Sequence, residues 1–170
     1  MSATTLIPVE EYLRSSYDPD REYVEGLLVE REVGELEHGE LQSAILAYIR
    51  ARYRGVAHAV VEVRMQVKCD RFRVPDVTVV VGARPKNIRV FTEPVLAVFE
   101  VLSPGDRAGD IEEKIHDYLD FGIRYVCVAD PYKRKAYLYT REAAHELKDL
   151  VLRTSDPELV VPIGELFDAE

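Results

Sequence analysis

The sequence lacks tryptophan altogether, and it has only two cysteines and two methionines. Cys69 and Cys127 are too far apart in the chain for a Cys-x-x-Cys motif, so we expect two free thiols rather than a disulfide or a zinc site. No window approaches the roughly 20 apolar residues that a membrane-spanning helix needs, and residues 1–20 hold no basic leader. These absences predict a cytoplasmic protein without a membrane segment.

Positive charge is also scarce. The sequence has 22 lysines and arginines but 31 aspartates and glutamates, which gives a formal net charge of −9. Affinity for a phosphate backbone rises with the number of cationic contacts, so this balance argues against a general nucleic-acid binder. An enzyme could still approach nucleic acid through a local basic surface. The candidates are residues 50–54, Arg71 with Arg73, and residues 132–135, although solvated helix and strand ends are the commoner explanation of each cluster.

The length and the hydrophobic pattern indicate one α/β domain. The chain has 170 residues, of which 47% are hydrophobic, and it shows no internal repeat, so we expect a single domain over residues 1–170. Helices are predicted over residues 7–16, 37–55 and 107–121, the last one closed by Gly122. Strands are predicted within residues 21–32, 59–67, 74–82, 94–102, 123–131 and 135–140. This order predicts a central mixed sheet with helices on both faces.

Two carboxylates stand alone on otherwise uncharged strand faces. Alternation isolates Asp76 in this way within residues 74–82, and Glu100 within residues 94–102. A buried ionised carboxylate costs several kcal/mol unless it is paired, hydrogen-bonded or bound to a metal. Each could pair separately with an arginine or a backbone N–H, which is the commoner solution for isolated carboxylates. A divalent cation between them would satisfy both, since Mg²⁺ prefers carboxylate oxygens.

A lysine on the following helix adds a third charged group. Across residues 108–123, helical spacing predicts an inner stripe of Ile111, Ile115, Tyr118 and Leu119. The solvent side is expected to hold Glu112, Glu113, Asp117 and Asp120. Lys114 lies on the border of the stripe, where a lone lysine is more often a surface group, but its aliphatic stem could carry the ammonium toward Glu100. Two acids and a lysine suit phosphodiester cleavage.

The ordered segments "VPDVTVV", "VFEVLSPGDR" and "DIEEKIHDYLDFGIRYVCVADP" resemble the Uma-type restriction-endonuclease family, a branch of the PD-(D/E)XK nuclease superfamily. The similarity spans roughly residues 8–140 and includes the hairpin "REYVEGLLVE" and the helix start "HGELQ". It implies a restriction-endonuclease-like fold, with a mixed central sheet flanked by helices. It also implies hydrolysis of DNA phosphodiester bonds that depends on Mg²⁺, with Mn²⁺ as a substitute.

Within this resemblance, Asp76 matches the motif aspartate and Glu100 the motif acid. Together with the backbone carbonyl of Val101, they are expected to bind Mg²⁺. The superfamily's usual motif places a lysine two positions after the acid, where this chain has Leu102. Lys114 matches the lysine that this family has on the next helix, and Lys68 is a rival candidate.

Glu40 resembles an extra catalytic acid that some superfamily members have on the first core helix. A first-turn acid favoured by the helix dipole is an equal alternative. We therefore include Glu40 among the candidate catalytic residues, with Asp76, Glu100 and Lys114.

Three functions are compatible with these residues. The first is an endonuclease, with double-stranded DNA as the expected substrate. A homodimer is then expected, because duplex cleavage needs two active sites and an edge strand such as residues 135–140 would gain from pairing. The second is a catalytically impaired module that binds nucleic acid or protein, favoured by the acidic surface and by Leu102. The third is a metal-dependent phosphoesterase for a small substrate.

Overall fold

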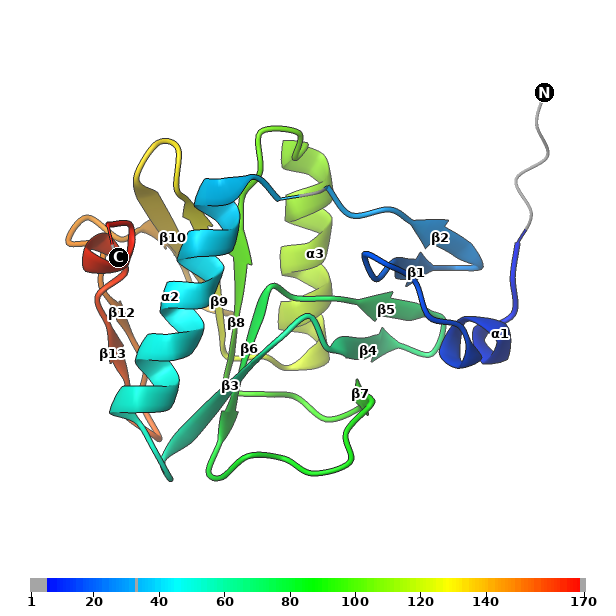
Figure 1. The fold of residues 1–170 in the computed structure, drawn as a ribbon, viewed down its shortest axis with the longest axis horizontal. Helices are drawn as coiled ribbons and strands as arrows, with labels where there is room; N and C mark the ends of the chain where they lie inside the picture. Colours follow the sequence, from blue (N-terminus) through cyan, green and yellow to red (C-terminus); the bar gives the residue numbers. More distant parts are fainter. Residues whose placement is uncertain (1–5, 33, 169–170) are drawn as a thin grey trace.

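The computed structural model describes residues 6–32 and 34–168, and its largest element is a six-stranded sheet (Figure 1). Its strands are β3 Ala57–Val61, β6 Val77–Val81, β8 Ala97–Val101, β9 Tyr125–Asp130, β10 Lys135–Tyr139 and β11 Ala144–Glu146. They lie in the order β11-β10-β9-β8-β6-β3. The pair β8–β9 is parallel and the other pairs are antiparallel. The sheet is therefore mixed, as the sequence predicted.

A second mixed sheet lies beside the first. Its strands are β1 Glu22–Val24, β2 Leu27–Val29, β4 Arg64–Lys68, β5 Arg71–Arg73 and β7 Val90–Phe91, in the order β2-β1-β5-β4-β7. The short helix α1, Val9–Arg14, covers it by packing Tyr12 against Tyr23 and Phe72, with ring centroids 5.1 and 5.3 Å apart. A small pair, β12 Leu152–Arg153 and β13 Val160–Val161, completes the strands.

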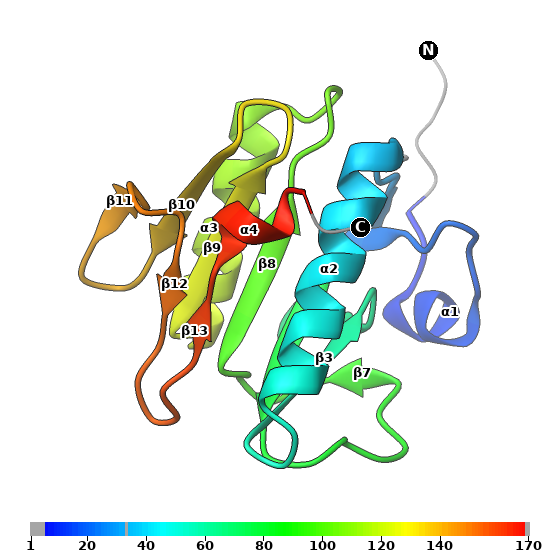
Figure 2. The same cartoon turned by 60° about the vertical axis from the view of Figure 1, so that its left-hand side comes forward.

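Two long helices pack on opposite faces of the six-stranded sheet (Figure 2). They are α2, Leu36–Arg52, and α3, Ala108–Phe121; the short α4, Ile163–Leu166, follows near the C-terminus. Successive side chains of β8 point to opposite faces, so Phe99 packs in the α2 core and Val98 in the α3 core. Glu100 has the parity of Val98, and its side chain therefore points toward α3.

Two expectations about strands are wrong. Residues 59–67 do not form one strand, because the chain turns at Glu62, which has φ 53°, and passes from β3 in the first sheet to β4 in the second. Residues 135–140 do not form an edge strand, because β11 pairs with β10. The edges of the six-stranded sheet are β3 and β11.

The two cysteines and the character of the helices bear on the expectations drawn from composition. Cys69 is exposed, Cys127 is buried, and both are free thiols. Between residues 6 and 168, apart from residue 33, no helix combines the length and the apolar character needed to cross a bilayer.

Helix α3 ends where the sequence predicted, at Gly122. This residue has φ 107°, and its N–H donates to the carbonyl of Leu119 at 3.1 Å. Such a left-handed residue suits glycine at the end of a helix. A Cβ here would also lie 3.2 Å from Cγ of Pro94.

We expect Gly122→Ala to lower the free energy of unfolding by about 1–2 kcal/mol, because alanine is strained in the left-handed region. Urea denaturation followed by circular dichroism measures this change. Gly109→Ala is the matched control, since a Cβ in this first turn of α3 meets no atom within 4 Å. Equal losses in the two variants would contradict the assignment of strain to Gly122.

Candidate active site

The two carboxylates singled out by the sequence lie opposite each other at one end of the six-stranded sheet. Val77 of β6 pairs with Phe99 of β8 in an antiparallel register, so the next residues outward, Asp76 and Glu100, face each other. Each residue is only 3% exposed. The structure therefore brings both acids together, away from bulk water.

Asp76 is held by three donors. Its Oδ1 accepts from Nη2 of Arg31 at 2.7 Å, and its Oδ2 accepts from the N–H of Val101 at 2.7 Å. Nε2 of His38 lies 3.3 Å from the same Oδ2. Burial favours a raised pKa for Asp76, but the hydrogen bond from His38 and the charge of Arg31 outweigh it and lower the pKa. Asp76 is therefore ionised at neutral pH.

Glu100 is in a different electrostatic state. Its Oε1 accepts from the hydroxyl of Tyr118 at 2.6 Å, and its Oε2 accepts from Nζ of Lys114 at 3.2 Å. Burial raises the pKa of Glu100 to about 7, against the favourable charge of Lys114 and with the support of the negative charges of Asp76 and Glu22. Glu100 is thus an acid whose charge is only partly compensated by its neighbours.

Lys114 reaches inward from α3, as the border position in the helical pattern predicted. Its side chain is 15% exposed, and its Nζ lies 3.2 Å from Glu100 and 3.1 Å from Oε1 of Glu22. Burial favours a lowered pKa, but these two carboxylates raise the pKa of Lys114 above its usual value. The ammonium is therefore charged and lies between two acids.

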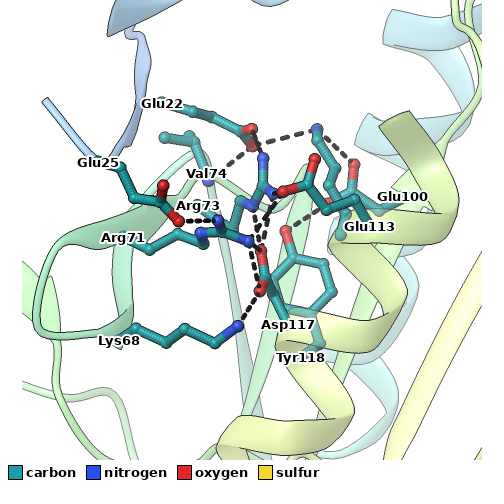
Figure 3. Close-up of polar contacts among 11 residues, drawn as sticks. Glu22, Glu25, Lys68, Arg71, Arg73, Val74, Glu100, Glu113, Asp117 and Tyr118 are labelled. Carbon is teal, nitrogen blue, oxygen red and sulfur yellow. Dashed lines mark hydrogen bonds and ion pairs between the residues drawn. The ribbon is translucent and has the colours of Figure 1, made fainter. Parts of the chain in front are cut away.

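Glu22 and Arg73 are residues of this cluster that sequence reasoning missed. Arg73 donates through Nη1 to Glu22 at 2.8 Å, and its Nη2 lies 2.7 Å from Oδ2 of Asp117 (Figure 3). The N–H of Val74 donates to the other oxygen of Glu22 at 3.1 Å. The one signal in the sequence was the place of Arg73 between two apolar residues, Phe72 and Val74, both of which are fully buried in the structure.

The solvent position predicted for Asp117 is wrong. Asp117 is 2% exposed, and it pairs with Arg73, with Arg71 at 3.1 Å and with Lys68 at 3.0 Å. The reason is that the second sheet packs on this part of α3, which a helical pattern alone cannot reveal. Arg71 and Arg73 are consequently engaged by carboxylates and do not form the basic surface considered for nucleic acid.

Two other candidates lie outside the acid pair. Lys68, the rival lysine, is bound to Asp117 and does not line the cleft that contains Asp76 and Glu100. Glu40 is exposed on α2 and does not line this cleft either, so its expected place beside the acids is not observed. His38, half a turn earlier on the same helix, points to Asp76 instead.

The acids and Lys114 line a cleft of about 330 Å³ between the two sheets and the start of α3. Glu22, Arg31, His38 and Arg73 also line it. Arg107, at the N-terminus of α3, is exposed where it lines the same cleft. The arrangement places a carboxylate pair beside cations, which suits the binding and cleavage of a phosphate ester.

The donor set fits a hard divalent cation of the kind that keeps several waters. In residues 6–32 and 34–168, no three histidine, cysteine, aspartate or glutamate side chains are arranged to hold a metal ion. Mg²⁺ does not require such a cage, since one or two carboxylates with water and substrate phosphate often suffice. Asp76 and Glu100 offer this chemistry, and Val101 lines the cleft beside them. Arg31 and Lys114 compensate the acids in the structure, which is the separate-pairing alternative considered from the sequence.

Comparisons with known proteins point to one family. The family model of Uma2, described as "Putative restriction endonuclease", matches residues 9–166. No curated protein matches the sequence. A crystal structure from Anabaena variabilis ATCC 29413, described as "a putative nuclease belonging to DUF820", aligns with a TM-score of 0.79 and 21% identity, covering 95% of this chain and 99% of that chain.

The structural likeness confirms the expected fold class, a mixed α/β arrangement with sheets flanked by helices. At this identity it speaks for the fold alone. The family model supports more, because it matches nearly the full length of the sequence and agrees with the resemblance seen in the motifs. The chain belongs to the Uma2 family, described as "Putative restriction endonuclease".

Proposed function

We propose that this protein is an endonuclease that hydrolyses DNA phosphodiester bonds with Mg²⁺, or with Mn²⁺ as a substitute. Family membership supports a nuclease, and therefore a hydrolase. The single observation that carries the proposal is the 3.2 Å contact between Nζ of Lys114 and Glu100, in the cleft that also contains Asp76. This contact supports the inference that Lys114 takes the role of the lysine absent from position 102.

In this proposal Asp76, Glu100 and the backbone carbonyl of Val101 hold the cation. When bound, Mg²⁺ supplies Lewis-acid polarisation of the phosphate and a water of lowered pKa. Tyr118 fixes the orientation of the Glu100 carboxylate through its 2.6 Å hydrogen bond. The N–H of Val101 does the same for Asp76.

Lys114 stabilises the negative charge that develops on the phosphate in the transition state. Its near burial strengthens this interaction, because the effective dielectric constant inside a cleft is lower than in water. Arg107 and the N-terminal N–H groups of α3 contact a neighbouring phosphate and position the strand. In this proposal DNA contacts only these few cations and the bound Mg²⁺, because acids outnumber lysines and arginines in the cleft as they do in the whole chain.

One observation favours an alternative, the catalytically impaired binding module. Both oxygens of Asp76 already accept hydrogen bonds, from Arg31 and from Val101, and a cation must compete with them. The acidic charge balance favours the small-substrate phosphoesterase. Cation binding and substrate choice separate these alternatives from the nuclease.

We expect Mg²⁺ or Mn²⁺, at about 100 times the dissociation constant, to raise the free energy of unfolding by about 2.7 kcal/mol. The corresponding rise in Tm is about 5–10 °C for a chain of this size. Asp76→Asn and Glu100→Gln should abolish this rise at pH 8, whereas Glu40→Gln should keep it. Because burial raises the pKa of Glu100 to about 7, protons compete with the cation and the rise should be smaller at pH 6. Thermal unfolding with and without EDTA measures it, and an unchanged Tm with both cations would count against the site.

We expect the purified protein to nick supercoiled plasmid with Mg²⁺ or Mn²⁺ but not with EDTA. Asp76→Ala and Lys114→Ala should each lower the rate by about 10²–10³-fold, the usual cost of removing such a group. Lys68→Ala and Glu40→Gln are the controls, since both side chains lie outside the cleft.

The two control variants also test whether Lys68 or Glu40 takes part in cleavage. A loss in Lys68→Ala with none in Lys114→Ala would assign the function to the rival lysine, and a loss in Glu40→Gln would return Glu40 to the site. Hydrolysis of a chromogenic phosphodiester without cleavage of plasmid or single-stranded DNA would indicate the phosphoesterase. Absence of both cleavage and calorimetric cation binding would leave the binding module.

We expect a homodimer in solution, because cutting both strands of a duplex needs two active sites. The argument from β10 no longer applies, but β3 and β11 remain as sheet edges that a second copy could extend. Size-exclusion chromatography with light scattering measures the mass. A particle of 19.4 kDa, the mass of one chain, would remove the dimer from the proposal.

A further inference from the structure

A second and larger depression adjoins the cleft. It has a volume of about 930 Å³, at the upper end of the roughly 300–1,000 Å³ of small-ligand pockets. Ser103, Asp106 and Ile111 line both depressions, so the two lie side by side. We call the second one the tyrosine groove.

The floor of the tyrosine groove is aromatic. Tyr137 pairs with Val128 of β9, and Tyr139 pairs with Val126. Since both valines pack in the core under α3, the two tyrosines lie on the α3 face of the sheet, where they are half-buried. Tyr132, from the turn after β9, is 40% exposed and lines the same groove.

Two of the three tyrosines have free hydroxyls, whereas the hydroxyl of Tyr132 donates to Oε2 of Glu35 at 3.5 Å. Within residues 6–32 and 34–168, the hydroxyls of Tyr137 and Tyr139 have no hydrogen-bond partner, and neither oxygen is among the buried unpartnered atoms, so both are open to solvent. Flat aromatic faces with open hydroxyls suit the stacking of nucleobases, which is tolerant of sequence because every base has a π-face.

The charges of the tyrosine groove favour a base over a phosphate as its occupant, although His116 and Lys133 also line it. Asp106, Glu112 and Asp130 line it, and Lys133 is paired with Asp130 at 3.3 Å. Carboxylates repel phosphates, but they accept hydrogen bonds from the amino groups of bases such as cytosine. The cations Lys114 and Arg107 lie in the adjoining cleft. Acids such as Glu32, Asp110 and Glu113 line the cleft as well, so a phosphate there depends on these two cations and on the proposed Mg²⁺. Among the described residues the groove has no such cation site, and its tyrosines and carboxylates suit a base.

We propose that the tyrosine groove binds unpaired nucleobases of the strand whose phosphodiester lies in the cleft. The inference rests on the proposed nuclease function and narrows its substrate to nucleic acid with unstacked bases beside the cut. Tyr137 and Tyr139 stack on the bases, and Glu112 accepts from their amino edges. Neither tyrosine takes part in the cleavage step itself.

The test is binding of a single-stranded DNA of about 10 nucleotides, within the roughly 4–16 that such sites cover. It contains 2-aminopurine, whose fluorescence falls on stacking, and the absence of tryptophan removes competing emission. EDTA prevents cleavage. The variants are Tyr137→Leu and Tyr139→Leu, which keep an apolar side chain. Tyr48→Leu is the matched control, because Tyr48 is a half-buried tyrosine on α2, on the other side of the sheet.

Wild type should quench 2-aminopurine, and each groove variant should bind about 5- to 150-fold more weakly, the range that corresponds to loss of one stacking contact. Tyr48→Leu should bind like wild type, and circular dichroism confirms that each variant is folded. An oligonucleotide with abasic sites keeps its phosphates, so it should bind weakly and equally to wild type and to the groove variants.

Equal affinity of wild type and both groove variants, or full affinity for the abasic strand, would overturn the proposal. So would a dimer that Tyr137→Leu converts to a monomer without any change in DNA binding, since the groove would then be covered by a second copy. Binding in EDTA does not need the cation. If bases bind but no strand is cleaved, only the proposed nuclease function is contradicted. If the groove variants cleave as fast as wild type, only the proposed role of the tyrosine groove is contradicted.

Discussion

The guanidinium of Arg73 lies between Glu22 of β1 and Asp117 of α3, at 2.8 and 2.7 Å, and all three residues are almost fully buried. Removing one partner from a buried ion pair costs about 3–5 kcal/mol, because the remaining charge loses its compensation. Here one cation compensates two carboxylates from different parts of the fold. It joins the second sheet to the helix that covers the first, and Glu22 in turn contacts Nζ of Lys114 at 3.1 Å. Arg73 therefore pairs with one of the two carboxylates that contact the lysine, the other being Glu100.

The two carboxylates of the cleft, Asp76 and Glu100, have pKa values that are shifted in opposite directions. Asp76 is well supplied with donors, so its pKa is lowered, whereas burial raises the pKa of Glu100 to about 7. Two facing carboxylates with opposite shifts are typical of functional sites, where the protein holds groups in states that water would not favour.

The sequence predicted the parts of the site that depend on local periodicity. Strand alternation identified Asp76 and Glu100, and helical spacing placed Lys114 at the border of a buried stripe. It did not predict Glu22, Arg73 or the burial of Asp117, because these depend on how the second sheet packs against α3. The break at Glu62 was hidden within an apolar run, and β11 within a polar one. The sequence also did not predict which side of α2 faces the acids. Glu40 points away from Asp76 and Glu100, whereas His38 points toward Asp76.

Helix α3 serves several parts of the molecule at once. Lys114 and Tyr118 hold Glu100, Asp117 anchors the helix to Arg73, and Ile115 lines the tyrosine groove. A helix of this length moves nearly as a rigid body, so its residues cannot shift independently. A displacement that widens the groove by moving α3 outward would also lengthen the contact between Lys114 and Glu100. Mechanical coupling between the two depressions is thus built into one element.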